Sequence, residues 1–218
     1  IFKQFINKYL TSRKIKMPKK VVVVGSGNAA LSAGIAALEK GANVVIYEKA
    51  DKKMAGGNTK YTAGAMRFSY ENGDQLMNLL KNPNDKRLKN TDFGSYTKEK
   101  FSLDLLNFND GRPLSPEQNI LVSKSLETIQ WLSSHNVKFE PIYSRQSFLK
   151  DGKHIFWGGL TLATENEGVG LFDQELEAFL SLGGKIHYNS PVTKLIYQHQ
   201  KVSGVLVDNK SVEADSVI

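Results

Sequence analysis

The stretch GSGNAA, residues 25–30, has the residue types and spacing of a turn that holds a diphosphate. Gly25 permits a sharp turn after the apolar run VVVV, and Gly27 lets the backbone approach a pyrophosphate closely. Ala30 keeps the helix that follows close to a sheet. The free N–H groups at the start of that helix then face the phosphates. The stretch predicts a dinucleotide-binding turn; the alternative is an α/β turn that binds nothing.

One carboxylate follows the turn at the sequence separation expected for a residue that binds the ribose. Glu48 closes the apolar run VVIYE, 21 residues after Gly27. A carboxylate at this place can accept hydrogen bonds from both hydroxyls of an adenosine ribose. The turn and the carboxylate together do not distinguish NAD from FAD.

The loop after Glu48 favours FAD. Residues 56–66 read GGNTKYTAGAM, which concentrates glycine and β-branched residues and therefore does not predict a stable helix. In an NAD dehydrogenase, the segment after the ribose acid usually begins another crossover helix. A long, glycine-dense loop instead suits a larger ligand, whose flavin ring is approached by backbone N–H groups and hydroxyls. We therefore expect FAD as the cofactor.

The elements that must position these residues form a predicted βαβ unit. Four β-branched residues, 21–24, predict a strand that is buried on both faces, as in a parallel sheet. Residues 28–40 predict a helix with Leu31, Ile35 and Leu38 on one face, and residues 44–47 predict a second strand. The usual crossover rule makes the two strands parallel.

The remainder of the chain predicts helices and strands around this unit. We interpret residues 66–145 as an excursion of helices and loops, in which Ser115 caps a helix that ends near His135. Residues 145–170 look too irregular for a regular element. The other expected elements are a short strand within 137–143, a turn at 168–170, a helix at 171–182, a strand at 185–188 and a three-stranded meander from residue 192.

The positive charge of the chain is confined to its start. The net charge is +7, and residues 1–20 hold seven basic residues and no acidic one. Without those seven, 22 basic and 22 acidic residues remain, so the body of the chain has no basic bias that would indicate nucleic-acid binding. We expect residues 1–20 to be a disordered basic leader, either a solvated tail or upstream sequence that is not translated. An organellar presequence is the alternative.

The composition indicates neither a membrane protein nor a thiol enzyme. No run of 18 apolar residues exists, so no transmembrane segment is expected. Cysteine is absent, which excludes a disulfide scaffold, a Cys-ligated metal and a thiol nucleophile, and fits a reducing compartment. We expect a cytoplasmic protein without a metal site.

These motifs together resemble a known flavoprotein family. The stretch GSGNAALSAGIAALEKG, the pair Glu48 and Lys49, and GGNTKYTAGAM resemble the FAD-binding part of fumarate reductase and succinate dehydrogenase flavoproteins. The sequence of residues 56–70 most resembles that of tricarballylate dehydrogenase-like proteins. The resemblance implies an α/β, Rossmann-like FAD-binding domain over residues 21–218, with a parallel sheet and a β-meander. It also implies that the domain continues beyond Ile218 and that a capping domain is missing.

The resemblance implies which residues bind FAD. Glu48 falls at the adenosine ribose, and Val192 falls where a backbone group meets the adenine. Members that attach FAD covalently carry a His in place of Asn58, so the resemblance implies non-covalent FAD. The pyrophosphate turn takes Gly25, Gly27, Ala29 and Ala30; the flavin and its ribityl phosphate take Asn58, Thr59, Thr62, Gly64 and Ala65; Lys49 and Gly57 complete the cofactor-binding set.

Catalytic residues are not identified by the resemblance. In the fumarate reductase branch, Arg and His side chains clamp the substrate carboxylates and an Arg delivers the proton, but none of these positions matches a residue here. We therefore expect the chain alone to be inactive. Arg145, Lys153 and His154 are the candidates within the chain that could face the flavin.

The acidic residues around 165–175 are expected to have no chemical role. Glu165 and Glu167 are interpreted as solvated loop charges. Asp173 and Glu175 are expected in the opening turn of a helix, where they complement its dipole.

The expected activity is hydride transfer between the flavin and a di- or tricarboxylate, such as tricarballylate, succinate or fumarate. The electron partner is unknown. Two alternatives remain open, a flavoprotein similar to 3-ketosteroid dehydrogenases and a non-functional chain that binds nothing.

Overall fold

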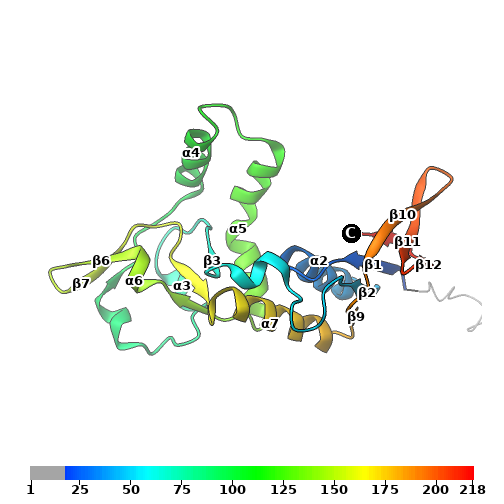
Figure 1. The fold of residues 1–218 in the computed structure, drawn as a ribbon. Helices are drawn as coiled ribbons and strands as arrows, with labels where there is room; N and C mark the ends of the chain where they lie inside the picture. The colour runs from blue at the N-terminus through cyan, green and yellow to red at the C-terminus, as the bar shows by residue number, and fades with distance from the viewer. Residues whose placement is uncertain (1–17) are drawn as a thin grey trace, which may run out of the picture.

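The computed structural model describes residues 18–218, so most of the expected basic leader lies outside the described residues. A four-stranded parallel sheet organises one end of the molecule (Figure 1). Its order is β13-β1-β2-β9, and all its neighbouring strands pair in parallel. The strands are β1 (Lys20–Val24), β2 (Asn43–Tyr47), β9 (Lys185–His187) and β13 (Ser216–Val217).

Helices α2 (Asn28–Glu39) and α7 (Glu167–Ser181) pack together and contribute to the hydrophobic cluster on one face of this sheet. Val21 and Val23 point into that cluster. The Phe179 ring fits against Gly34, where an added Cβ would lie 2.8 Å from the ring. The small residue at position 34 therefore lets α7 approach α2 closely.

The other face of β1 meets an antiparallel meander. Its strands are β10 (Val192–Gln198), β11 (Lys201–Val207) and β12 (Lys210–Glu213). Val22 packs with Val205 and Val207, while its neighbours in β1 face the helices. Residues 21–23 of β1 are all apolar because both faces of the strand are covered, one by the helices and the other by the meander.

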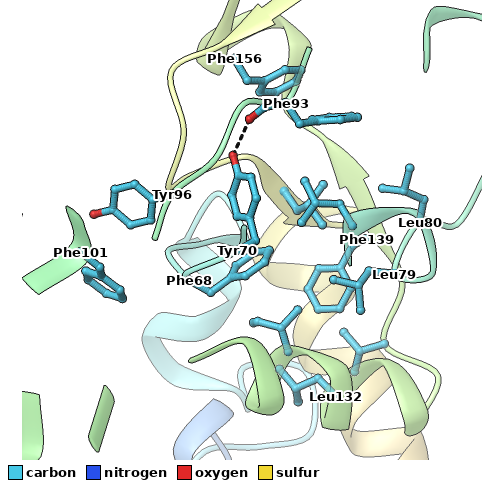
Figure 2. Close-up of a cluster of buried hydrophobic side chains, with 14 of the residues drawn as sticks. Phe68, Tyr70, Leu79, Leu80, Phe93, Tyr96, Phe101, Leu132, Phe139 and Phe156 are labelled. Atoms are coloured by element: carbon cyan, nitrogen blue, oxygen red, sulfur yellow. Dashed lines mark hydrogen bonds between the residues drawn. The ribbon is translucent and has the colours of Figure 1, made fainter. Parts of the chain in front are cut away.

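The excursion between β2 and α7 has its own hydrophobic cluster (Figure 2). Two three-stranded sheets frame it, with orders β3-β8-β5 and β4-β7-β6. Figure 2 shows Phe68, Tyr70 and Phe139 in the cluster, where the Tyr70 hydroxyl donates to the Phe93 carbonyl oxygen at 2.7 Å. Its elements are β3 (Ala65–Met66), α3 (Asp74–Met77), η2 (Lys86–Asn90), β4 (Thr91–Asp92), α4 (Lys98–Phe108), α5 (Pro116–Ser134), β5 (Phe139–Pro141), α6 (Tyr143–Gln146), β6 (Ser147–Lys150), β7 (Lys153–Phe156) and β8 (Leu162–Thr164).

Two local expectations were wrong. Residues 147–156 form a regular hairpin, β6–β7, and residues 162–164 form β8, although glycine and aromatic residues made the region look irregular. The expected turn at 168–170 is the first turn of α7. Both helical positions require glycine. A Cβ at position 168 would clash with the Thr59 carbonyl oxygen, and one at position 170 would clash with the Glu165 carbonyl oxygen.

The expected helix α5 is confirmed with both of its ends. Ser115 accepts a hydrogen bond from the Gln118 N–H, the Gln118 side chain accepts one from the Ser115 N–H, and His135 is the C-cap. In residues 18–218, no helix combines the length and apolar character needed to cross a membrane.

Candidate functional site

The turn between β1 and α2 presents a helix start without a side-chain cap. Gly25 has a φ of +94°, which favours glycine, and Gly27 occupies the N-cap position of α2. Thr97 and Ser115 cap α4 and α5 with their side chains, whereas α2 has no such bond. Leu31 is the first residue of α2 whose backbone N–H makes a helical hydrogen bond, to the Gly27 carbonyl oxygen at 3.0 Å. The earlier N–H groups of Ala29 and Ala30 are therefore placed for an anionic acceptor, which the helix dipole also favours.

Glu48 is fixed beside this turn. The residue is 6% exposed, and its carboxylate accepts hydrogen bonds from the Ser26 hydroxyl at 2.6 Å and from the Ala50 N–H at 2.8 Å. Ser26 also accepts the Gly56 N–H at 3.1 Å. A carboxylate has about four acceptor positions, so two remain for hydroxyls of a ligand. Ser26 thus ties together the turn, the end of β2 and the loop that follows it.

The glycine-dense loop is docked on both helices and is more ordered than expected. Residues 57–61 form the 3₁₀ helix η1 (Gly57–Tyr61). The Thr59 hydroxyl accepts the Asn28 N–H at 2.9 Å, and the Gly168 N–H donates to the Thr62 oxygen at 3.0 Å. Gly64 is buried with a φ of +63°, and a Cβ there would clash with Thr164. Exposed side chains and backbone remain at Gly57, Asn58, Thr62 and Ala65.

The carboxyl ends of the parallel strands gather the predicted positions at one edge of the sheet. Val192 begins β10 and, with Val24 and Ile218, lines a groove of about 480 Å³ next to the glycine turn. Lys49 is exposed beside Glu48. Ligands of open parallel sheets bind at this edge. The structure therefore brings the predicted turn, carboxylate, loop and meander strand into one region.

The candidate substrate residues lie elsewhere. Lys153 and His154 are on the β6–β7 hairpin, which Figure 1 shows at the opposite end of the molecule from β1 and β2. Lys153 pairs with Asp92 at 3.5 Å, and the His154 ring packs edge-on against Tyr143. Arg145 pairs with Glu167 at 3.1 Å. The Glu165 side chain pairs with Lys81 and is only 28% exposed. Glu167 is solvated as expected, with its side chain 63% exposed, but it lies at the start of α7 and pairs with Arg145.

Glu175 is a buried residue that the sequence interpretation placed wrongly. Because α7 begins at Glu167, Glu175 lies in its third turn and is 0% exposed. It accepts a hydrogen bond from the Ser32 hydroxyl at 2.7 Å. Burial raises the pKa of the Glu175 carboxyl to about 7, and the Ser32 bond opposes that rise. The spacing of Leu171, Glu175 and Phe179 places all three on one buried face and could have revealed it.

A family model described as FAD binding domain matches residues 20–217. The chain belongs to this FAD-binding family. FAD is therefore its cofactor, and the expected α/β, Rossmann-like fold with a parallel sheet and a meander is confirmed. The family is one of FAD-dependent oxidoreductases, which includes fumarate reductase flavoproteins.

Two curated relatives are similar in sequence. Fumarate reductase (cytochrome) from Shewanella frigidimarina is 40% identical over 63 residues, which are 29% of this chain and 11% of that protein. NADH:acrylate oxidoreductase from Vibrio harveyi is 26% identical over an alignment that covers 94% of this chain and 23% of that protein. The chain thus spans less than a third of the length of these relatives.

Solved structures share the fold. The open conformation of a flavocytochrome c3 fumarate reductase matches with a TM-score of 0.65 and 23% identity, covering 99% of this chain and 35% of that one. A 3-ketosteroid-Δ4-(5α)-dehydrogenase from Rhodococcus jostii RHA1 matches with a TM-score of 0.62 and 17% identity, covering 96% and 47%.

The residues at the sheet edge fit FAD. The uncapped start of α2 suits a diphosphate, and the remaining acceptor positions of Glu48 suit ribose hydroxyls. The backbone at Gly27 lies close to the loop that follows Glu48, because an added Cβ would lie 3.3 Å from the Thr59 hydroxyl and 3.6 Å from the Gly56 oxygen. A larger side chain at position 27 would therefore crowd the turn.

Proposed function

We propose that residues 21–218 form the FAD-binding domain, with an excursion at about 66–145, and hold FAD without a covalent bond. The observation that supports this most strongly is the uncapped start of α2 beside a carboxylate fixed by Ser26. The diphosphate binds Gly25, Gly27, Ala29 and Ala30, and the ribose binds Glu48. The other proposed contacts are Lys49, Gly57, Asn58, Thr59, Thr62, Gly64, Ala65 and Val192.

Each group has a defined task in this proposal. The N–H groups of Ala29 and Ala30 donate to the phosphates, and the helix dipole adds to their attraction. Ser26 orients Glu48 for the ribose hydroxyls. The amide side chain of Asn58 contacts the flavin, and because an amide is not a nucleophile the attachment stays non-covalent.

The proposed reaction is hydride transfer between FAD and a di- or tricarboxylate, such as tricarballylate, succinate or fumarate. When bound, FAD supplies the hydride chemistry at its flavin ring. Sequence similarity to a fumarate reductase, and to an oxidoreductase whose name gives acrylate, supports a carboxylate substrate. The electron partner is not assigned.

We further propose that the described residues alone do not turn over a carboxylate. All four described arginines pair with carboxylates of the protein: Arg67 with Asp104, Arg87 with Asp85, Arg112 with Asp110 and Arg145 with Glu167. A carboxylate substrate needs cations that are free to bind it, and one missing preorganised donor costs about 10²- to 10³-fold in rate. The proton donor and the substrate clamp are therefore expected outside residues 18–218.

A second candidate function is oxidation of a 3-ketosteroid, which the fold similarity to a 3-ketosteroid dehydrogenase allows. A chain that binds no cofactor is the third possibility. One set of measurements separates the three. The purified chain is titrated with FAD, and a longer natural form is assayed with a reduced dye and fumarate or cis-aconitate, and with a 3-ketosteroid and an oxidised dye. Carboxylate reduction supports the proposal, steroid oxidation contradicts it, and absent FAD binding supports the third possibility.

A further inference from the structure

Glu175 of α7 lies directly beneath the first turn of α2, outside the proposed FAD contacts. The two helices pack against each other and share a hydrophobic cluster with β1 and β2. Asn28 is the first residue of α2, and its amide lies 2.9 and 3.0 Å from the two Glu175 oxygens when its nitrogen faces them. The Ser32 hydroxyl, one turn further along α2, donates to the same carboxyl at 2.7 Å. Glu175 thus contacts the element that begins at the diphosphate turn.

The Asn28 amide has two possible orientations against this carboxyl. An ionised Glu175 is an acceptor only, so Asn28 must present its NH₂ group. A protonated Glu175 can donate its proton to the Asn28 oxygen, and the amide then turns its NH₂ group the other way. The backbone N–H of Asn28 is held at the same time by Thr59 at 2.9 Å. The protonation state of Glu175 therefore decides whether the oxygen or the NH₂ group of the Asn28 amide faces away from the carboxyl.

No positive charge offsets Glu175 within the described residues. On the elements packed against α7, Glu39 of α2 binds Trp131 and His135, and Lys60 of η1 lies over the Phe172 ring with its ammonium 4.6 Å from the centroid. Strand β8 carries no charged residue. On α7 itself, the other charged groups are Glu167, which pairs with Arg145, and the exposed Asp173 and Glu177.

We propose that Glu175 is a positioning residue that couples FAD binding to uptake of one proton by its carboxyl. A diphosphate on the α2 N–H groups brings negative charge to the same end of the helix that Glu175 contacts. Two negative groups that share a poorly solvated region cannot both stay ionised at low cost, so the buried carboxyl accepts a proton. Neutral Glu175 donates to Asn28, whose NH₂ group then turns away from it. The proposal rests on the assignment of the diphosphate to this turn.

The pH dependence of FAD affinity follows from this coupling. Because burial already raises the pKa of Glu175 to about 7, the carboxyl is partly protonated near neutral pH before the cofactor binds. Binding raises the pKa further, so the dissociation constant is constant below about pH 7 and increases above it. A further rise of about one pKa unit increases the dissociation constant about sevenfold between pH 6.5 and 9.

The test is FAD titration of the apoprotein between pH 6 and 9, followed by flavin fluorescence, for wild type, Glu175→Gln and Glu177→Gln. We expect an approximately eightfold rise in the dissociation constant for wild type and for Glu177→Gln, which removes an exposed charge from the same helix. Glu175→Gln should bind with the low-pH affinity at every pH. Calorimetry of wild type at pH 7.5, in buffers of different ionisation enthalpy, should show proton uptake and needs no variant.

The outcomes distinguish the coupling from the site. Tight binding with a flat pH profile and no proton uptake overturns the coupling and leaves the FAD site intact. A pH profile retained in Glu175→Gln assigns the proton to another group and also overturns the coupling. Absence of FAD binding at every pH overturns the site and the coupling together.

Discussion

The Ser26 hydroxyl donates a 2.6 Å hydrogen bond to the Glu48 carboxylate, and both residues are buried. This bond joins the glycine turn after β1 to the end of β2. Ser26 also accepts the Gly56 N–H, so one hydroxyl fixes three segments of the proposed FAD site. The middle residue of the GSG turn therefore has a structural task that its place between two glycines does not reveal.

Ser26→Ala should destabilise the fold and weaken FAD binding together. The substitution leaves the buried Gly56 N–H without its acceptor and Glu48 without one donor, which costs about 1–3 kcal/mol. Urea unfolding of the apoprotein measures the first effect, and FAD titration the second. Ser123→Ala, at an exposed position of α5, is the control and should change neither quantity measurably.

Glu48→Ala should weaken FAD binding by about 1.5–3 kcal/mol, the range for hydrogen bonds to a charged group. Glu48→Gln keeps the size of the side chain but loses the charge, so its effect should be smaller. FAD titration at pH 7 compares the two variants. Unchanged affinity in both would mean that the carboxylate does not face the ribose.

Gly27→Val should abolish FAD binding and leave the fold largely intact. The new side chain would occupy the approach to the turn, where Thr59 already lies 3.3 Å from the position of a Cβ. Circular dichroism checks the fold, and flavin release after denaturation reports the bound cofactor. Ala36→Val, at an exposed position of the same helix, should retain FAD. A Gly27→Val protein that purifies with FAD contradicts the assignment of the diphosphate.

Gly168→Ala should destabilise the protein although alanine favours helices over glycine. A Cβ at this position would clash with the Thr59 oxygen and lie 2.6 Å from the Thr62 hydroxyl. The overlap should cost about 1–3 kcal/mol and displace η1 from α7. Urea unfolding tests this, with Val169→Ala, at the neighbouring exposed position, as the control. Equal midpoints for Gly168→Ala and wild type would show that η1 is not packed as described.

The stability of the apoprotein should depend on pH through Glu175. The folded carboxyl has its pKa raised from 4.5 to about 7, so between these values the folded state holds a proton that the unfolded state has lost. The free energy of unfolding therefore falls as pH rises from about 4.5 to 7. Glu175→Gln removes this fall and should be more stable than wild type at pH 8 by at most about 3 kcal/mol. Urea unfolding at pH 5 and 8 checks this, and the difference between the proteins should be much smaller at pH 5.

The sequence predicted the elements with a strong local pattern. Four valines in a row, the glycine turn and the apolar face of residues 28–40 led to β1 and α2, and Ser115 with Pro116 marked the start of α5. Strands β7 and β8 are not evident from the sequence, because they are stabilised by pairing with distant residues, such as Thr91 with His154 and Ala65 with Ala163. Local propensity carries no information on such partners.

Only the part of the proposed site that depends on local sequence could be predicted. The turn and Glu48 are recognisable from spacing along the chain. The contacts of Glu175 with α2 depend on how α7 packs against α2. The local sequence does not reveal that packing. Glu175 was assigned to the helix dipole because the helix was expected to begin at Leu171, when it begins at Glu167.

The pairing of β1 with β13 has a consequence for how the chain folds. Val21 pairs with Ser216, and the Lys20 N–H bonds to Asp215 across a sequence separation of 195 residues. Strand β13 must leave the ribosome before it can cover this edge of β1. Such long-range parallel pairing slows folding, because a large loop closes before the contacts form. The βαβ unit and the excursion can form earlier, so this edge of β1 stays unpaired until residues 216–217 have been synthesised.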